Sequence, residues 1–153
     1  MRLTITGDYI FNTHNLRTIC MLFFPGESIT ENGAEDSPSA GVEIRFADGG
    51  YAVATEVSFD GRTMSEERFV PSQGMDIKLE AARLLYEVLT KLTGYNPPWG
   101  CLTGVRPSKR AGDYVRMYGD DAKHRFERDY LLSEEKSELA FDIYRRQEDI
   151  IKS

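Results

Sequence analysis

The chain has 153 residues, of which 41% are hydrophobic and 29% charged, a composition typical of a domain that folds without disulfides or metals. Its net charge of −6 lies entirely in residues 1–93, which carry 8 basic and 14 acidic side chains, whereas residues 94–153 carry 11 of each. This acidic first half argues against a protein that wraps nucleic acid or binds an anionic membrane.

The sequence shows neither the pattern of a membrane helix nor that of a secretory signal. No stretch approaches the roughly 20 apolar residues of a membrane helix, and the first residues lack the apolar run of a secretory signal. Cys20 and Cys101 are the only cysteines, so neither a disulfide framework nor a zinc knuckle is expected. We therefore expect a cytoplasmic protein that does not bind membranes.

The first elements in chain order are a strand and a helix. Residues 2–6 alternate polar and apolar side chains, as a half-buried strand does. Apolar residues then recur at helical spacing up to Pro25-Gly26, with Asn12 or Thr13 placed to cap the start; they are Leu16, Ile19, Cys20 and Phe23. Residues 26–41 are small, acidic and aperiodic, which predicts a mobile surface loop.

Three alternating segments and a long helix follow. Residues 42–46, 51–59 and 63–70 read as strands joined by turns at residues 48–50 and at Asp60-Gly61, so we expect an antiparallel meander. An amphipathic helix then runs between Asp76, which suits its N-terminus, and Gly94, which suits its C-terminus. The predicted fold class is α+β, in the order β-α-β-β-β-α, followed by a small helical extension.

The segment 95–98 contains two prolines and is the best internal boundary. We expect an α+β accessory domain at residues 1–94 and a helical connector at residues 95–153. Three helices are predicted in the connector, beginning near Pro107, after Asp120-Asp121 and after Ser133. On the third helix, Leu139, Ile143 and Ile150 are expected to form the apolar stripe.

The most unusual segment is residues 99–109, WGCLTGVRPSK, which leads into a helix N-terminus. Glycines and cations at such a position can bind an anion, but the segment does not match the GxxxxGK[ST] pattern of nucleotide-binding loops. Three interpretations remain open: a turn that packs on the core, a docking surface for another domain, or a small-anion site. The candidate residues are Trp99, Gly100, Thr103, Gly104, Arg106, Pro107 and Lys109.

No catalytic, cofactor-binding or metal-binding residue is predicted in this chain. Cys20 and Cys101 are expected to be buried, and His14 and His124 lie on separate segments without metal-ligand spacing. A basic cluster lies between residues 106 and 116, but an acid interrupts it, so binding to nucleic acid is not the favoured interpretation.

A resemblance adds to this interpretation. Residues 99–109 resemble the W-G-x-L-T-G-[IV]-R-P-[ST]-K segment of HemZ-type proteins, which are oxygen-independent coproporphyrinogen III oxidases. Residues 128–136 are similar to the D-Y-L-[IL]-x-x-E-K segment of the same family, and residues 145–147 to its [DR]-R-Q segment. The resemblance is specific over residues 95–153 and extends to residues 1–94 only in length and pattern.

The resemblance implies a parent oxidoreductase of the radical SAM class that decarboxylates coproporphyrinogen III in haem and porphyrin biosynthesis. It implies a [4Fe-4S] cluster and S-adenosylmethionine in the parent, although some relatives look like haem carriers. The cluster loop C-x3-C-x2-C would lie beyond Ser153, so no cofactor is expected in this chain.

The expected role is therefore a non-catalytic amino-terminal accessory domain, whose partner is the radical SAM barrel of the same polypeptide. The alternative is a separate binding module that uses the helix at residues 106–116 to bind RNA or an acidic protein partner.

Overall fold

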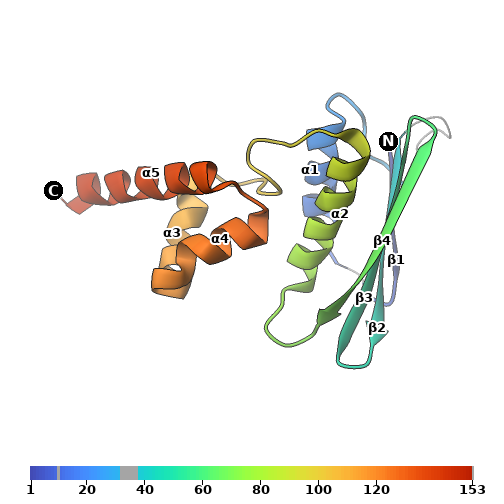
Figure 1. The fold of residues 1–153 in the computed structure, drawn as a ribbon, viewed down its shortest axis with the longest axis horizontal. Coiled ribbons are helices and arrows are strands. Elements are labelled where there is room, and N and C mark those ends of the chain that lie inside the picture. The colour runs from blue at the N-terminus through green and yellow to red at the C-terminus, as the bar shows by residue number, and fades with distance from the viewer. Residues whose placement is uncertain (10, 32–37, 153) are drawn as a thin grey trace. The chain divides into compact units, whose positions relative to one another are not determined.

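The computed structural model describes residues 1–9, 11–31 and 38–152, and it divides the chain into two compact units. The amino-terminal unit is Met1–Asn96 and the carboxyl-terminal unit is Pro97–Ser153. Figure 1 labels the elements of both units. The division falls between Asn96 and Pro97, inside the proline-containing segment, and each unit has its own buried core.

A four-stranded sheet forms one layer of the amino-terminal unit. Its strands are β1 (Arg2–Gly7), β2 (Ser39–Ala47), β3 (Gly50–Phe59) and β4 (Arg62–Pro71), in the spatial order β1-β2-β3-β4. β2, β3 and β4 pair antiparallel, which confirms the predicted meander and the α+β class. β1 pairs with β2 in parallel, a pairing that requires a crossover and that the sequence pattern did not reveal.

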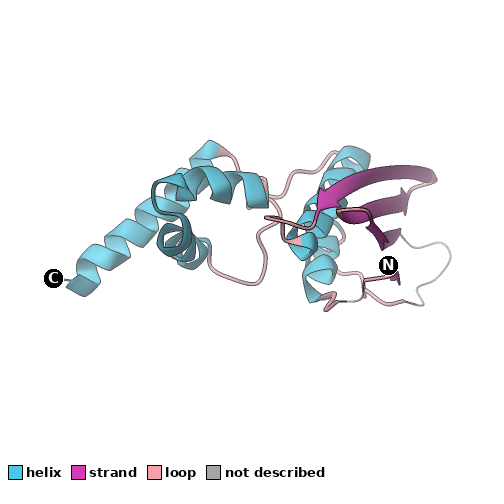
Figure 2. Cartoon of the chain, turned by 90° about the horizontal axis from the view of Figure 1, so that it is seen from below, coloured by secondary structure: helices cyan, strands magenta, loops and turns pink. Residues whose placement is uncertain are grey.

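Two helices cover one face of the sheet, α1 (His14–Phe23) and α2 (Ile77–Thr93), and both views show them on the same side of it (Figures 1 and 2). Their caps explain where they begin. The Asn12 side chain accepts a hydrogen bond from the His14 backbone N–H at 2.9 Å, whereas the Thr13 side chain makes no cap bond. The Asp76 carboxylate accepts bonds from the first turn of α2, as predicted.

The segment predicted as a long mobile loop is shorter than expected. β2 begins at Ser39, so residues 39–41 are strand, and Ala40 is buried where it pairs with Leu3 of β1. Ile29 is also buried. Ser39, Ala40 and Gly41 give no hydrophobic signal in the sequence, yet their small size suits a strand that pairs with β1 on one side and β3 on the other. Residues 32–37 of the predicted loop lie outside the described residues.

The carboxyl-terminal unit consists of helices, as predicted. They are α3 (Pro107–Tyr118), a short 3-10 turn (Gly119–Asp121), α4 (Ala122–Tyr130) and α5 (Glu134–Lys152). Pro107 occupies the first turn of α3, and the Ser133 hydroxyl accepts a hydrogen bond from the Lys136 backbone N–H at the start of α5. Their shared core consists of Leu102, Ala111, Tyr114, Ala122, Phe126, Leu132, Ala140 and Phe141.

The predicted apolar stripe of α5 is wrong. Leu139, Ile143 and Ile150 are 45%, 37% and 72% exposed, and the buried face instead carries Ser137, Ala140 and Phe141. Small residues determine which face of α5 is buried, because α3 and α5 approach closely. An added Cβ at Gly112 of α3 would lie 2.5 Å from the ring of Tyr144. A close helix contact therefore takes precedence over burying the largest aliphatic side chains.

Candidate functional site

Residues 99–106 form a turn that leads directly into α3, and residues 107–109 are the start of that helix. Gly100 adopts a φ of +55°, and a Cβ at this position would lie 2.1 Å from the carbonyl oxygen of Tyr130. Only glycine fits this place without moving backbone atoms. The first glycine of the segment is therefore needed for a close backbone approach within the carboxyl-terminal unit.

The two segments that carry the strongest resemblance contact each other. The Cys101 backbone N–H donates to the Tyr130 carbonyl at 3.0 Å, and the Cys101 Sγ lies 3.6 Å from the Asp129 carbonyl oxygen. The Lys136 ammonium lies 5.0 Å from the centre of the Trp99 ring. Residues 99–101 and 129–136 thus form one structural cluster, which we call the motif cluster.

A buried polar pair joins the motif cluster to α3. The Tyr114 hydroxyl donates to the Asp129 carboxylate at 2.6 Å, and the second oxygen of that carboxylate accepts from Arg128 at 2.9 Å. Tyr114 and Asp129 are 4% and 5% exposed. Burial, followed by the hydrogen bond to Asp129, raises the pKa of Tyr114, and burial also raises the pKa of Tyr130. These groups hold α3 against the end of α4.

The sequence did not single out this pair, although a signal was present. Asp129 lies three residues after Phe126, which is on the buried side of its helix. Aspartate on such a face needs a donor, and Tyr114 lies on the apolar stripe of the preceding helix. Spacing alone could not identify which hydroxyl would meet which carboxylate.

The remaining candidate residues lie towards solvent. Gly104, Arg106 and Lys109 are exposed, and Thr103 and Pro107 are partly buried. Arg106 is the N-cap of α3 but makes no side-chain cap bond. Trp99 and Gly100 therefore belong to the motif cluster, while Arg106 and Lys109 lie on the surface beside the start of α3.

The basic side chains of α3 are partly neutralised within the helix. The Asp113 carboxylate lies 2.5 Å from the Arg116 guanidinium and 3.5 Å from that of Arg110. One acid thus engages two of the cations on which the alternative interpretation depends.

The residues of this chain do not fit an iron–sulfur cluster. Such a cluster needs three or four thiolates, but Cys20 and Cys101 are both buried and belong to different units. Burial raises the pKa of the Cys20 thiol to about 12, which disfavours the thiolate. Within residues 1–9, 11–31 and 38–152, no group of three His, Cys, Asp or Glu side chains could hold a metal ion.

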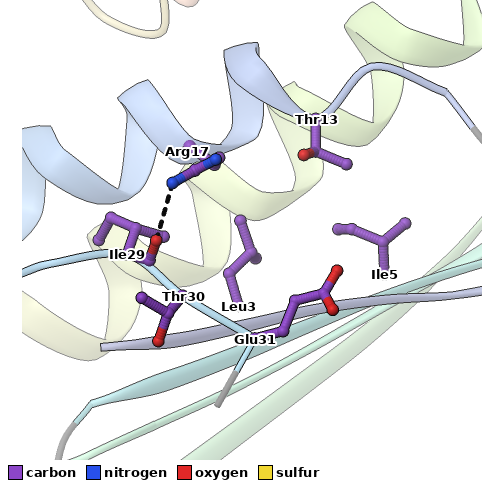
Figure 3. A pocket seen from close by; sticks show the side chains of 7 residues that line it. All are labelled: Leu3, Ile5, Thr13, Arg17, Ile29, Thr30 and Glu31. Atoms are coloured by element: carbon purple, nitrogen blue, oxygen red, sulfur yellow. Dashed lines mark hydrogen bonds between the residues drawn. The ribbon is translucent and has the colours of Figure 1, made fainter. Parts of the chain in front are cut away.

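A hollow of about 310 Å³ lies between α1 and β1 in the amino-terminal unit (Figure 3). The Arg17 guanidinium at its rim donates a hydrogen bond to the Ile29 carbonyl at 2.9 Å. Part of its hydrogen-bonding capacity is therefore used by the backbone. The sequence did not predict the hollow, because its walls come from three separate segments. They are Leu3, Ile5, Thr13, Arg17, Ile29, Thr30 and Glu31.

None of the helices in the described part of the chain has both the length and the apolar content of a membrane span.

Comparisons with known proteins give distant likenesses. No protein-family model matches the chain, and no curated protein does. One similar solved structure is the amino-terminal domain of Protein Y from Thermus thermophilus, with 15% identity, a TM-score of 0.40 and coverage of 61% of this chain and 98% of that chain. Another is a ribosomal subunit interface protein from Coxiella burnetii, with 15% identity, a TM-score of 0.39 and coverage of 62% and 97%. At this distance neither likeness assigns a function.

The enzyme class implied by the resemblance is corrected by these findings. The two named structures are not radical SAM or haem-biosynthesis enzymes. The described residues also contain no group that could hold a metal. The oxidoreductase, iron–sulfur and S-adenosylmethionine terms, which the resemblance implied for the parent protein, are therefore withdrawn as a description of this chain.

Proposed function

We propose that this chain is the non-catalytic amino-terminal accessory domain of a HemZ-type protein and that its carboxyl-terminal unit docks onto another folded domain of that protein. The observation that carries this proposal is the motif cluster. The two segments on which the resemblance depends are far apart in sequence, yet Cys101 and Tyr130 join them by a backbone hydrogen bond. Residues that maintain such a contact have a structural role, and no reactive group is required of them.

Exposed aliphatic side chains on α5 support the docking role. Leu139 and Ile143 are four residues apart, which places them on the same side of the helix, and both are more than one-third exposed. They lie away from the face formed by Ser137, Ala140 and Phe141. We assign this outer face of α5 to contact with the catalytic barrel of a HemZ-type protein in the cytoplasm.

A binding experiment tests this assignment. The chain is mixed with the separately produced barrel of a HemZ-type protein, and the dissociation constant is measured by isothermal titration calorimetry. Burying the exposed parts of Leu139 and Ile143 contributes roughly 1–2 kcal/mol, so the double substitution Leu139→Asp with Ile143→Asp should weaken binding about tenfold or more.

The matched control is Met21→Asp, which changes an exposed apolar residue of α1 in the amino-terminal unit. It should leave the affinity unchanged, and circular dichroism verifies that every variant is folded. The proposal fails if the unmodified chain does not bind the barrel, or if the double variant binds as tightly as Met21→Asp.

The alternative role, binding of RNA or of an acidic protein surface by residues 106–116, makes a different prediction. Binding would fall with increasing salt and would be weakened by Arg110→Glu and Arg116→Glu. If no binding to RNA is detected at low salt, this alternative is excluded.

A further inference from the structure

The backbone of β4 has an edge without a partner strand. β4 is the outermost strand of the sheet, and the two-residue turn Asp60-Gly61, with φ values of +54° and +74°, makes Phe59 and Arg62 a hydrogen-bonded pair. Because bonding alternates along an antiparallel pair, the even-numbered residues of β4 bond to β3. The N–H and C=O groups of Thr63, Ser65, Glu67 and Phe69 therefore point away from the sheet.

The opposite edge of the sheet is partly covered. Thr30 forms a bridge with Arg2 beside β1; its N–H donates to the Met1 carbonyl at 3.1 Å, and its carbonyl accepts from the Leu3 N–H at 2.9 Å. Among the described residues, no comparable segment lies along β4. The sheet thus offers β4 as its longest uncovered edge.

The β4 edge is held in a fixed position. Its pairing with β3 continues without a bulge over ten residue pairs. Two ion pairs attach its inner side chains to α2: Arg68 lies 2.5 Å from Glu87, and Glu66 pairs with Lys91. Edge strands of natural proteins are commonly distorted or covered, and neither occurs here. A straight, fixed edge lowers the entropic cost of adding a strand.

The charge along this edge favours a basic partner. Glu67 is exposed on the open face of the sheet, and the exposed Glu56 lies on the same face of the adjacent strand. Phe69, also exposed, offers an apolar contact to the stem of a long side chain.

We propose that the edge of β4 binds an extended, basic segment of a partner protein, which adds to the sheet as a fifth strand. Backbone hydrogen bonds to residues 63, 65, 67 and 69 supply the affinity, and alternate Lys or Arg side chains lie beside Glu67. Pro71 lacks an N–H and ends the usable edge, so the bound segment spans about seven residues. This inference concerns the amino-terminal unit and does not rest on the proposed docking through α5.

A synthetic peptide tests the proposal directly. The probe is a nine-residue peptide in which lysine alternates with valine and threonine, titrated into the 15N-labelled chain. The backbone amide signals of residues 63, 65, 67 and 69 should shift most. Ser65→Pro removes one outward N–H without breaking a backbone hydrogen bond to β3, and the loss of that N–H should weaken binding by about fivefold or more.

Ser65→Ala is the matched control. Both substitutions remove the hydroxyl that donates to Glu56, but alanine keeps the backbone N–H, so its affinity should equal that of the unmodified chain. Glu67→Lys should weaken the lysine peptide and favour a glutamate counterpart. The proposal is overturned if the lysine peptide does not bind at millimolar concentration, if Ser65→Pro binds like Ser65→Ala, or if the edge is already occupied by a second copy of the chain.

Discussion

Replacing Gly100 with alanine tests whether the motif cluster is a structural contact. The new Cβ would lie 2.1 Å from the Tyr130 carbonyl oxygen and 2.8 Å from that of Leu131. Both neighbours are backbone atoms, so relief requires the turn to separate from the end of α4. We expect the carboxyl-terminal unit to lose stability while the amino-terminal unit keeps its own.

The size of the effect follows from two contributions. A non-glycine residue at a φ of +55° costs about 1–2 kcal/mol, and overpacking against fixed atoms costs about 1–3 kcal/mol. Gly104 provides the matched control, because its φ of +77° is similar but an added Cβ would meet no atom within 4 Å. Gly104→Ala should therefore cost only the first contribution, and the two variants should differ by about 1–3 kcal/mol.

Fluorescence of Trp99 measures this difference selectively. It is the only tryptophan of the chain, it belongs to the carboxyl-terminal unit, and it adjoins Gly100. In a domain of this size, 1 kcal/mol corresponds to about 4–8 °C in Tm, so Gly100→Ala should unfold at least about 4 °C below Gly104→Ala. Equal transitions for the two variants would refute the contact between Gly100 and Tyr130.

Three further predictions concern single groups. Tyr114→Phe removes a donor from the buried Asp129 carboxylate and should cost about 1–3 kcal/mol in the Trp99 transition; an unchanged transition would contradict this hydrogen bond. Cys20 and Cys101 are 0% and 2% exposed, and burial raises the pKa of the Cys20 thiol to about 12. A thiol reagent at pH 8 should therefore label neither cysteine until denaturant is added. Rapid labelling of the folded chain would contradict their burial. Asp76→Ala removes the cap of α2 and should lower the stability of the amino-terminal unit by about 1 kcal/mol, measured by circular dichroism; no change would mean that the cap contributes nothing.

Local signals in the sequence predicted most of the secondary structure. Alternation identified β2, β3 and β4, and cap residues such as Asp76 and Gly94 identified the ends of α2. These signals depend on neighbours within a few positions. The parallel pairing of β1 with β2 depends on residues nearly forty positions apart, and no local pattern in Ser39, Ala40 and Gly41 marks them as a strand.

Side-chain orientation on α5 and the composition of the motif cluster could not be predicted in the same way. Hydrophobicity favoured burial of Leu139 and Ile143, but the close approach of Gly112 and Tyr144 determines which face of α5 is inside. The segment that contains Gly100 is unusual in sequence, whereas its contact with Tyr130 depends on how the helices of the carboxyl-terminal unit pack. Tertiary contacts made by glycine leave little trace in hydrophobic periodicity.

The unequal edges of the sheet have a consequence for self-association. A chain of copies joined strand to strand would need an accessible edge at both ends of every sheet, because each copy must accept one neighbour and offer itself to the next. Thr30 already bonds to the backbone of Met1 and Leu3 beside β1, so that end cannot receive a full-length strand. Repeated strand-to-strand pairing through both edges of the sheet is therefore hindered at the start of β1.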